Sequence, residues 1–166
     1  MNQQEINQLN NISYTELQQK LSTIPDNFER NLLKTIYACC ARVGEITKPR
    51  YKTYKGKGLM GKDIEITSSS LIFTLLTEKR NIARRVPISR IDVPTHNYFK
   101  ENEAWLTEDI INYVKHFDGQ ELIFPRSTRW AEKVFEKYFG EFGQRVHLLR
   151  HWRTTHLLSG AATGMP

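Results

Sequence analysis

The sequence is poor in cysteine. Its 166 residues include only two, Cys39 and Cys40, which are adjacent and lie in an apolar stretch. Adjacent cysteines rarely bond to each other and cannot build a disulfide framework, which excludes the small disulfide-stabilised secreted class. This cysteine usage fits a reducing compartment. We therefore expect a cytoplasmic protein in which Cys39 is an inert core thiol.

The sequence also lacks a stretch that would direct the chain to or through a membrane. Residues 1–5 carry no positive charge and lead into no apolar segment of the kind found in signal peptides. No apolar run approaches the roughly 20 residues that a membrane-spanning helix needs. We expect no membrane partner.

Acidic residues are fewer than basic ones. The chain has 24 lysines and arginines against 18 aspartates and glutamates, which gives a formal net charge of +6 and a pI of about 9.4. An excess of positive charge favours a polyanionic partner, chiefly nucleic acid, with an acidic membrane surface as the weaker option. The plain alternative is a cytosolic protein that happens to be basic.

The length corresponds to one domain, in which a polar lead-in at residues 1–13 precedes a single core at 14–166. Apolar residues recur at helical spacing from Leu17 to Ile24 and in four later segments. These later helices are expected at 28–46, 103–117, 130–139 and 148–158, with Ser127 as a cap for the third of them. Alternating residues predict strands at 63–67, 71–77 and 84–88. The expected fold is mostly α with a small inserted three-stranded antiparallel sheet, and with a short buried extended segment at 122–125.

A basic loop is expected between the second helix and the sheet. Residues 48–62 contain no acidic side chain, and Tyr51 and Tyr54 lie among the cations. Basic groups interleaved with aromatic rings can follow a phosphate backbone, so this loop is a candidate DNA contact. Its candidate contacts are Lys52, Lys55, Lys57 and Lys62.

The same loop contains a glycine pattern that imitates nucleotide-binding motifs. Residues 56–62 fit both G-x-G-x-x-G and a Walker A sequence, except that Asp63 stands where the latter needs serine or threonine. Both motifs require a buried strand before the loop and a helix after it, whereas here a basic stretch precedes and a strand-like stretch follows. A nucleotide-binding protein is therefore a weak alternative.

The last expected helix begins with a cluster of histidine and arginine. His147 and Arg150 are three positions apart, so on a helix they share a face, and an imidazole beside a guanidinium suits a phosphate. The plain alternative is a solvated basic helix over a leucine core. His147 and His151 also have the spacing of half a zinc site, but Leu148 replaces the glutamate of H-E-x-x-H and no third ligand stands out. We expect no metal and no cofactor.

Three stretches of the chain carry residues with a shared order and spacing. Arg42 and Glu45 form an Arg-x-x-Glu pair, Lys79 lies in the predicted hairpin with Pro87 eight residues later, and residues 147–151 read His-x-x-Arg-His. Taken in this order, they resemble the catalytic domain of the tyrosine recombinase (phage integrase) family, which has a hairpin lysine at the second of these places. Residues 122–125 are similar to the family's leucine-phenylalanine-proline segment, and the resemblance covers roughly residues 14–165.

The resemblance implies a metal-independent enzyme that cleaves and rejoins double-stranded DNA through a 3′-phosphotyrosine link. Arg42 and Arg150 would stabilise the charge that develops on phosphorus, His147 would assist at a phosphate oxygen, and Lys79 would protonate the departing 5′ oxygen. Glu45 would support the site structurally. The partners implied are DNA of the nucleoid, a virus or a mobile element, and other protomers bound to it. Further expected DNA contacts are Arg80, Arg84, Arg85, His151 and Arg153.

The sequence departs from the family pattern at the nucleophile. The family's tyrosine follows the second arginine, but this chain has no tyrosine after Tyr138, which precedes the His147 motif. As an isolated chain it is expected to be inactive in cleavage. The alternative is a non-catalytic DNA-binding module that keeps the phosphate clamp. On that view Arg42 and Glu45 could be an ordinary helix pair, and the basic hairpin a solvated sheet edge.

Overall fold

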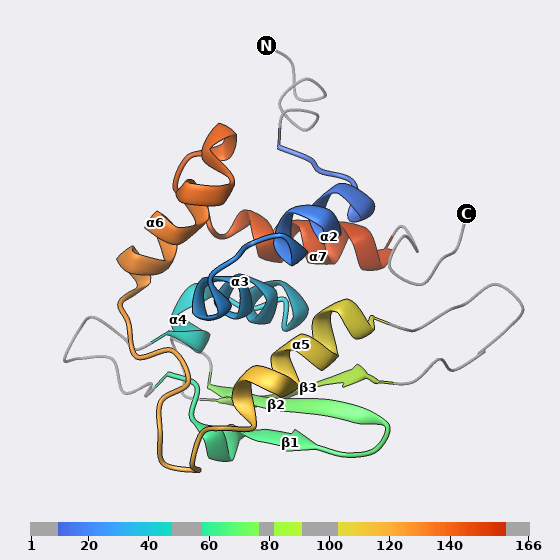
Figure 1. The fold of residues 1–166 in the computed structure, drawn as a ribbon, viewed down its shortest axis with the longest axis vertical. Coiled ribbons are helices and arrows are strands. Elements are labelled where there is room, and N and C mark those ends of the chain that lie inside the picture. The colour runs from blue at the N-terminus through green and yellow to red at the C-terminus, as the bar shows by residue number, and fades with distance from the viewer. Residues whose placement is uncertain (1–9, 48–57, 77–81, 91–102, 159–166) are drawn as a thin grey trace, which may run out of the picture.

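A computed structural model of the chain describes residues 10–47, 58–76, 82–90 and 103–158 (Figure 1). These residues form a mostly helical fold with one small antiparallel sheet, as expected. The α-helices are α2 (Tyr14–Ser22), α3 (Asn27–Ala38), α4 (Val43–Ile46), α5 (Ala104–Val114), α6 (Thr128–Tyr138) and α7 (Leu148–Leu158). Two short 3-10 turns, η1 (Gly61–Asp63) and η2 (Gly140–Phe142), complete the helical elements.

The sheet contains three strands in the order β1 (Ile64–Ile66), β2 (Ser70–Leu76) and β3 (Ala83–Ser89). All pairs are antiparallel, with Ile64 opposite Phe73 and Leu71 opposite Ile88. Alternate residues of β2 are buried, namely Leu71, Phe73 and Leu75. This period of two places one face of the sheet on the core, and it explains why the three strands could be predicted to within two residues.

Three helices begin at side-chain caps that the sequence makes recognisable. Ser13 Oγ accepts the N–H of Glu16 at 3.1 Å, Asp26 Oδ1 accepts that of Glu29 at 2.7 Å, and Ser127 Oγ accepts that of Trp130 at 3.2 Å. Each satisfies a backbone donor that the first helical turn leaves unpaired. The expected cap at Ser127 is confirmed.

The single helix expected over residues 28–46 is wrong. Helix α3 ends at Ala38, and Cys40 has φ +49° in the left-handed region. The amides of Cys40 and Ala41 return to the carbonyls of Tyr37 and Ile36 at 3.1 Å each, which is the Schellman pattern of helix termination. The left-handed position of this turn is usually glycine. Because Cys40 stands there instead, the sequence pattern does not indicate the end of the helix. As a result Arg42 precedes α4 as its N-cap residue, with extended backbone.

Helix α3 forms the centre of the fold, between α7 and α5 in Figure 1. Its residues 31–38 are all buried, including Leu33, Ile36 and Tyr37. Aromatic side chains of α6 and α7 continue this core, with Phe135 and Phe139 stacked at 5.0 Å beside Trp152. Burial of each large apolar side chain contributes roughly 1.5–3 kcal/mol, so this core dominates stability.

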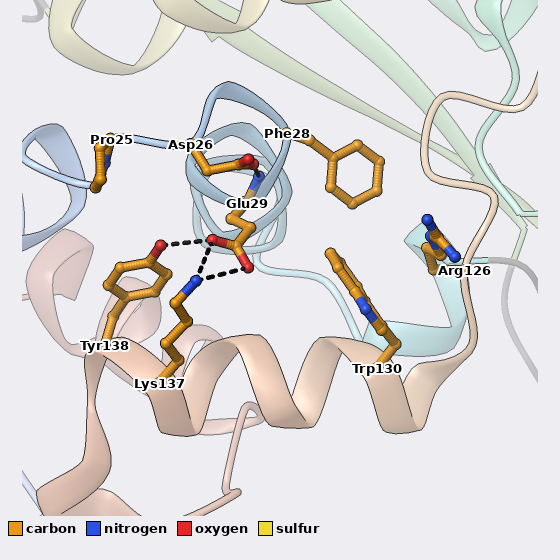
Figure 2. A pocket seen from close by; sticks show the side chains of 8 residues that line it. All are labelled: Pro25, Asp26, Phe28, Glu29, Arg126, Trp130, Lys137 and Tyr138. Carbon is orange, nitrogen blue, oxygen red and sulfur yellow. Dashed lines mark hydrogen bonds and ion pairs between the residues drawn. The ribbon is translucent and has the colours of Figure 1, made fainter.

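The N-terminal end of α3 is joined to α6 around a surface concavity of about 370 Å³ (Figure 2). Glu29 accepts a hydrogen bond from the Tyr138 hydroxyl and an ion pair from Lys137 at 3.0 Å. Phe28 packs edge-on against Trp130, with ring centroids 5.1 Å apart. Partial burial and the Glu29 carboxylate raise the pKa of Tyr138, so its hydroxyl is harder to ionise than a free phenol. These contacts hold the two helices together.

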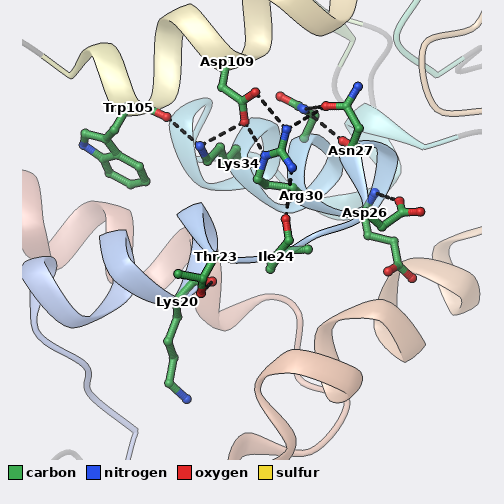
Figure 3. A network of polar contacts seen from close by, with 11 residues as sticks. Lys20, Thr23, Ile24, Asp26, Asn27, Arg30, Lys34, Trp105 and Asp109 are labelled. Carbon is green, nitrogen blue, oxygen red and sulfur yellow. Dashed lines mark hydrogen bonds and ion pairs between the residues drawn. The ribbon is translucent and has the colours of Figure 1, made fainter.

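A second polar cluster joins α3 to α5 (Figure 3). Asp109 accepts from Arg30 at 2.7 Å and from Lys34 at 3.0 Å, and Lys34 also donates to the carbonyl of Trp105 at 2.6 Å. Burial lowers the pKa of Lys34, and Asp109 opposes that shift. Because every charge in this cluster has a partner, it serves the packing of the two helices.

The glycine-rich stretch packs against the segment at residues 122–125. Ile123 donates its N–H to the carbonyl of Leu59 at 2.9 Å, and Ile123 and Phe124 are fully buried, as expected. A Cβ at Gly61 would lie 2.3 Å from the carbonyl oxygen of Asp118. Gly61 is therefore needed for close backbone packing. The following residues form η1 and then β1, not the long helix of a phosphate-binding loop.

Candidate functional site

The exposed stripe of α7 carries the histidine and arginine motif. His147 lies immediately before the helix, and its carbonyl accepts the N–H groups of Arg150 at 3.1 Å and His151 at 3.2 Å. His147 and His151 are exposed and Arg150 is half-buried, whereas Leu148, Leu149 and Trp152 face the core. At 100° per residue, the three polar side chains share one quarter of the helix surface.

The turn at residues 39–42 lies along one edge of this stripe. The thiol of Cys40 is 3.2 Å from Thr154 Oγ1 and 3.6 Å from the carbonyl oxygen of Arg150. Arg42 follows two residues later and is exposed. The elements that carry Arg42 and Arg150 therefore adjoin, although the two residues are far apart in the sequence.

Glu45 fixes the conformation of this turn. Its Oε1 accepts the N–H of Arg42 at 2.9 Å, and the side chain is nearly buried. Arg84 of β3 bridges to it, with Nε 3.1 Å from Oε2 and with Nη2 near the carbonyls of Cys39 and Cys40 at 3.4 and 3.3 Å. The hydrogen bond and charge of Glu45 raise the pKa of Arg84 against the cost of its partial burial. Arg84, expected at DNA, thus links β3 to the turn.

Arg153, which was expected to contact DNA, lies in the interior of the protein. Its side chain is 4% exposed and forms two hydrogen bonds of 2.7 Å with the carboxylate of Glu103. The guanidinium also lies over the ring of Tyr37, 5.0 Å from its centroid. Burial lowers the pKa of Arg153, but the Glu103 hydrogen bonds and charge outweigh it and raise the pKa overall. Helical spacing placed Arg153 on α7 but could not identify a partner 50 residues away.

The remaining expected DNA contacts divide into exposed residues and residues outside the described ranges. Lys62 in η1 and Arg85 in β3 are exposed, and Arg85 forms a 3.2 Å pair with Glu65 that is open to solvent on both sides. Such exposed pairs contribute about 0–1 kcal/mol, so Arg85 can exchange partners. The hairpin lysine and part of the basic loop lie outside the described residues, namely Lys52, Lys55, Lys57, Lys79 and Arg80.

The last residues of the lead-in form the other edge of the stripe, which sequence reasoning missed. Trp152 Nε1 donates to the carbonyl of Asn10 at 2.6 Å, and His156 Nε2 donates to that of Ile12 at 2.8 Å. His156 Nδ1 lies 2.6 Å from the Tyr37 hydroxyl, and burial lowers the pKa of His156, so the neutral ring accepts there. We call residues 10–12 the N-terminal strap. Residues 10–12, which were expected to belong to the polar lead-in, are thus anchored to α7.

Two concavities flank the stripe and differ in their charge balance. One of about 570 Å³ lies beside the turn and includes Arg84, Glu103 and Arg153, whose charges are paired within the protein. The other, of about 440 Å³, lies beside the strap. Its lining residues are Asn10, Arg145, His147, Leu148 and His151.

The described residues contain neither a metal-ligand cluster nor a membrane-spanning helix. No group of three or more histidine, cysteine, aspartate or glutamate side chains among them could hold a metal ion. Within the same ranges, no helix combines the length and the apolar character needed to cross a bilayer. The exposed stripe with its two edges is the strongest candidate site because it gathers imidazole and guanidinium groups, and these groups suit an anion.

No protein-family model matches this chain, and no curated protein or solved structure matches it either.

Proposed function

We propose that this chain is a DNA-binding catalytic core of the tyrosine recombinase type. In this core one DNA phosphodiester would bind between Arg42 and Arg150. The observation that carries the proposal is the contact between the Arg42 turn and α7, made by Cys40 with Arg150 and Thr154. It brings together two elements of the sequence pattern that are more than 100 residues apart. A plain basic helix would not require this neighbour.

The chemistry proposed for the site is electrostatic. Attack on a DNA phosphodiester places extra negative charge on the oxygens of a five-coordinate phosphorus, and two fixed guanidinium groups stabilise that charge without a metal. His147, exposed immediately before α7, would donate a hydrogen bond to a phosphate oxygen. Lys79 would protonate the departing 5′ oxygen, as the resemblance implies.

The support given by Glu45 fits this role for Arg42. An exposed arginine loses conformational freedom when it binds a phosphate, and this costs up to about 2 kcal/mol. Glu45 fixes the backbone of Arg42, and Arg84 fixes Glu45 in turn. A rigid backbone at Arg42 leaves only the side chain to be ordered upon binding.

The proposal is tested by duplex DNA binding as a function of salt. Contacts to about five phosphates would give a log–log slope of affinity against salt near −4 to −5 in fluorescence anisotropy titrations. Arg42→Ala and Arg150→Ala should each weaken binding about tenfold near physiological salt. Lys115→Ala removes an exposed cation at the end of α5 and is the charge-matched control. An affinity that does not change with salt would contradict the proposal.

A non-catalytic DNA-binding module would give the same binding results. The two functions separate at Lys79 and His147, because binding alone needs neither a proton donor for a leaving group nor an aligned imidazole. Covalent chemistry with a supplied tyrosine, described below, distinguishes them.

A further inference from the structure

The concavity beside the N-terminal strap differs in its charge balance from the concavity beside the turn. Arg145, His147 and His151 contribute its polar side chains, together with Asn10 of the strap. Arg145 donates from Nη2 to the side-chain oxygen of Asn10. Among the described residues, no carboxylate forms an ion pair with Arg145, whereas Arg84 and Arg153 are paired with Glu45 and Glu103. The positive charge of Arg145 is therefore not neutralised by a carboxylate of the described residues.

Asn10 is itself held firmly. Its carbonyl accepts from Trp152 Nε1 at 2.6 Å, and Trp152 is 1% exposed in the core. The neighbouring Ile12 carbonyl is fixed by His156. Asn10 thus lies between the buried Trp152, which anchors its backbone, and the exposed guanidinium of Arg145. Its side chain holds that guanidinium in a defined position. A neutral carboxamide achieves this without reducing the charge of the arginine.

We propose that this concavity is a second phosphate subsite, with Arg145 as its main contact and Asn10 as the positioning residue. Resting on the proposed function, the ligand is a phosphate of the DNA backbone next to the one held by Arg42 and Arg150. His147 lines this concavity and also belongs to the motif proposed to bind the reacting phosphate. The concavity and the position between Arg42 and Arg150 would therefore hold adjacent phosphates of the DNA backbone. Arginine offers two parallel donors to such a group, and the imidazoles offer more.

A transition metal is the competing ligand for His147 and His151. The cationic guanidinium of Arg145 would repel a metal ion in the same concavity, and the described residues supply no third ligand. The charge pattern therefore favours an oxyanion.

The first test is the salt dependence of duplex DNA binding by the whole chain. Removing one phosphate contact lowers the magnitude of the log–log slope by about 0.9. Arg145→Ala should do so and weaken binding about fivefold to tenfold, whereas Arg145→Lys should keep the slope. Asn10→Ala should weaken binding by a few-fold, and Asn11→Ala, an exposed neighbour of the same type, should have no effect. Equal slopes for the wild type and Arg145→Ala would overturn the subsite.

The second test uses inorganic phosphate as the probe and follows the imidazole signals of His147 and His151 by NMR. Saturable shifts that Arg145→Ala abolishes are expected, and zinc added instead should produce no specific shifts. If phosphate shifts these signals but duplex DNA does not bind, the subsite stands and the proposed function fails. If DNA binding depends on Arg42 and Arg150 but neither test responds to Arg145→Ala, the proposed function stands and the subsite is wrong.

Discussion

The thiol of Cys40 lies 3.6 Å from the carbonyl oxygen of Arg150, a residue 110 positions further along the chain. The contact depends on a left-handed backbone at Cys40, which ends α3 and turns the chain toward α7. Left-handed backbone costs an ordinary residue roughly 1–2 kcal/mol, and glycine avoids that cost. The position of the Arg42 turn thus depends on a conformation that few residues adopt easily.

Substitutions at Cys40 should therefore separate backbone shape from side-chain contact. Cys40→Gly removes the thiol but tolerates the turn, so its free energy of unfolding should stay within about 1 kcal/mol of the wild type. Cys40→Val places a β-branched side chain at a positive φ and should destabilise by about 2 kcal/mol or more. Urea denaturation measures both variants. Equal stability of the two would contradict the importance of the left-handed turn.

The buried pair of Arg153 and Glu103 should govern stability. Removing one partner leaves an unpaired buried charge, so Arg153→Ala or Glu103→Ala should cost about 3–5 kcal/mol, measured by denaturant unfolding. At temperatures where these variants remain folded, their salt slope for DNA binding should equal that of the wild type. A slope reduced in Arg153→Ala would return Arg153 to the set of DNA contacts.

Stability should also depend on pH through His156. Burial lowers its pKa in the folded state below the ordinary 6.5, opposed by the hydrogen bond to Ile12, and Arg153, Glu103 and His151 contribute smaller effects. The unfolded chain then binds the proton more readily, so stability falls as the pH drops below about 6.5, by at most about 1.4 kcal/mol per pH unit. His156→Gln should show a shallower pH dependence of its unfolding free energy. An unchanged slope would assign the effect to another group.

Local signals explain what could be predicted of the fold. The sheet could be predicted from the alternation of Leu71, Phe73 and Leu75, and the start of α6 from the cap at Ser127. Both signals lie in residues close together in the sequence. The end of α3 was missed because its left-handed residue is Cys40, and pattern reasoning expects glycine there.

Long-range contacts explain what was missed in the site. The exposed position of His147 beside core-facing leucines follows from helical spacing, but Arg153 belongs to the interior because it pairs with Glu103. The strap was overlooked because Asn10 is a polar residue in a polar stretch, and its partners Arg145 and Trp152 are more than 130 residues away. Pairings of this kind exist only once the chain has folded.

The most direct measurement is covalent adduct formation on a nicked duplex DNA substrate, read on a denaturing gel. Residues 1–166 alone should bind this DNA and form no adduct, because no tyrosine follows the His147 motif. A version extended by a segment bearing the family's tyrosine should form one. Arg150→Ala should abolish it, and Lys79→Ala should slow it unless the substrate carries a better leaving group. A covalent band from residues 1–166 alone, or none from the extended version despite DNA binding, would contradict strand cleavage at this site.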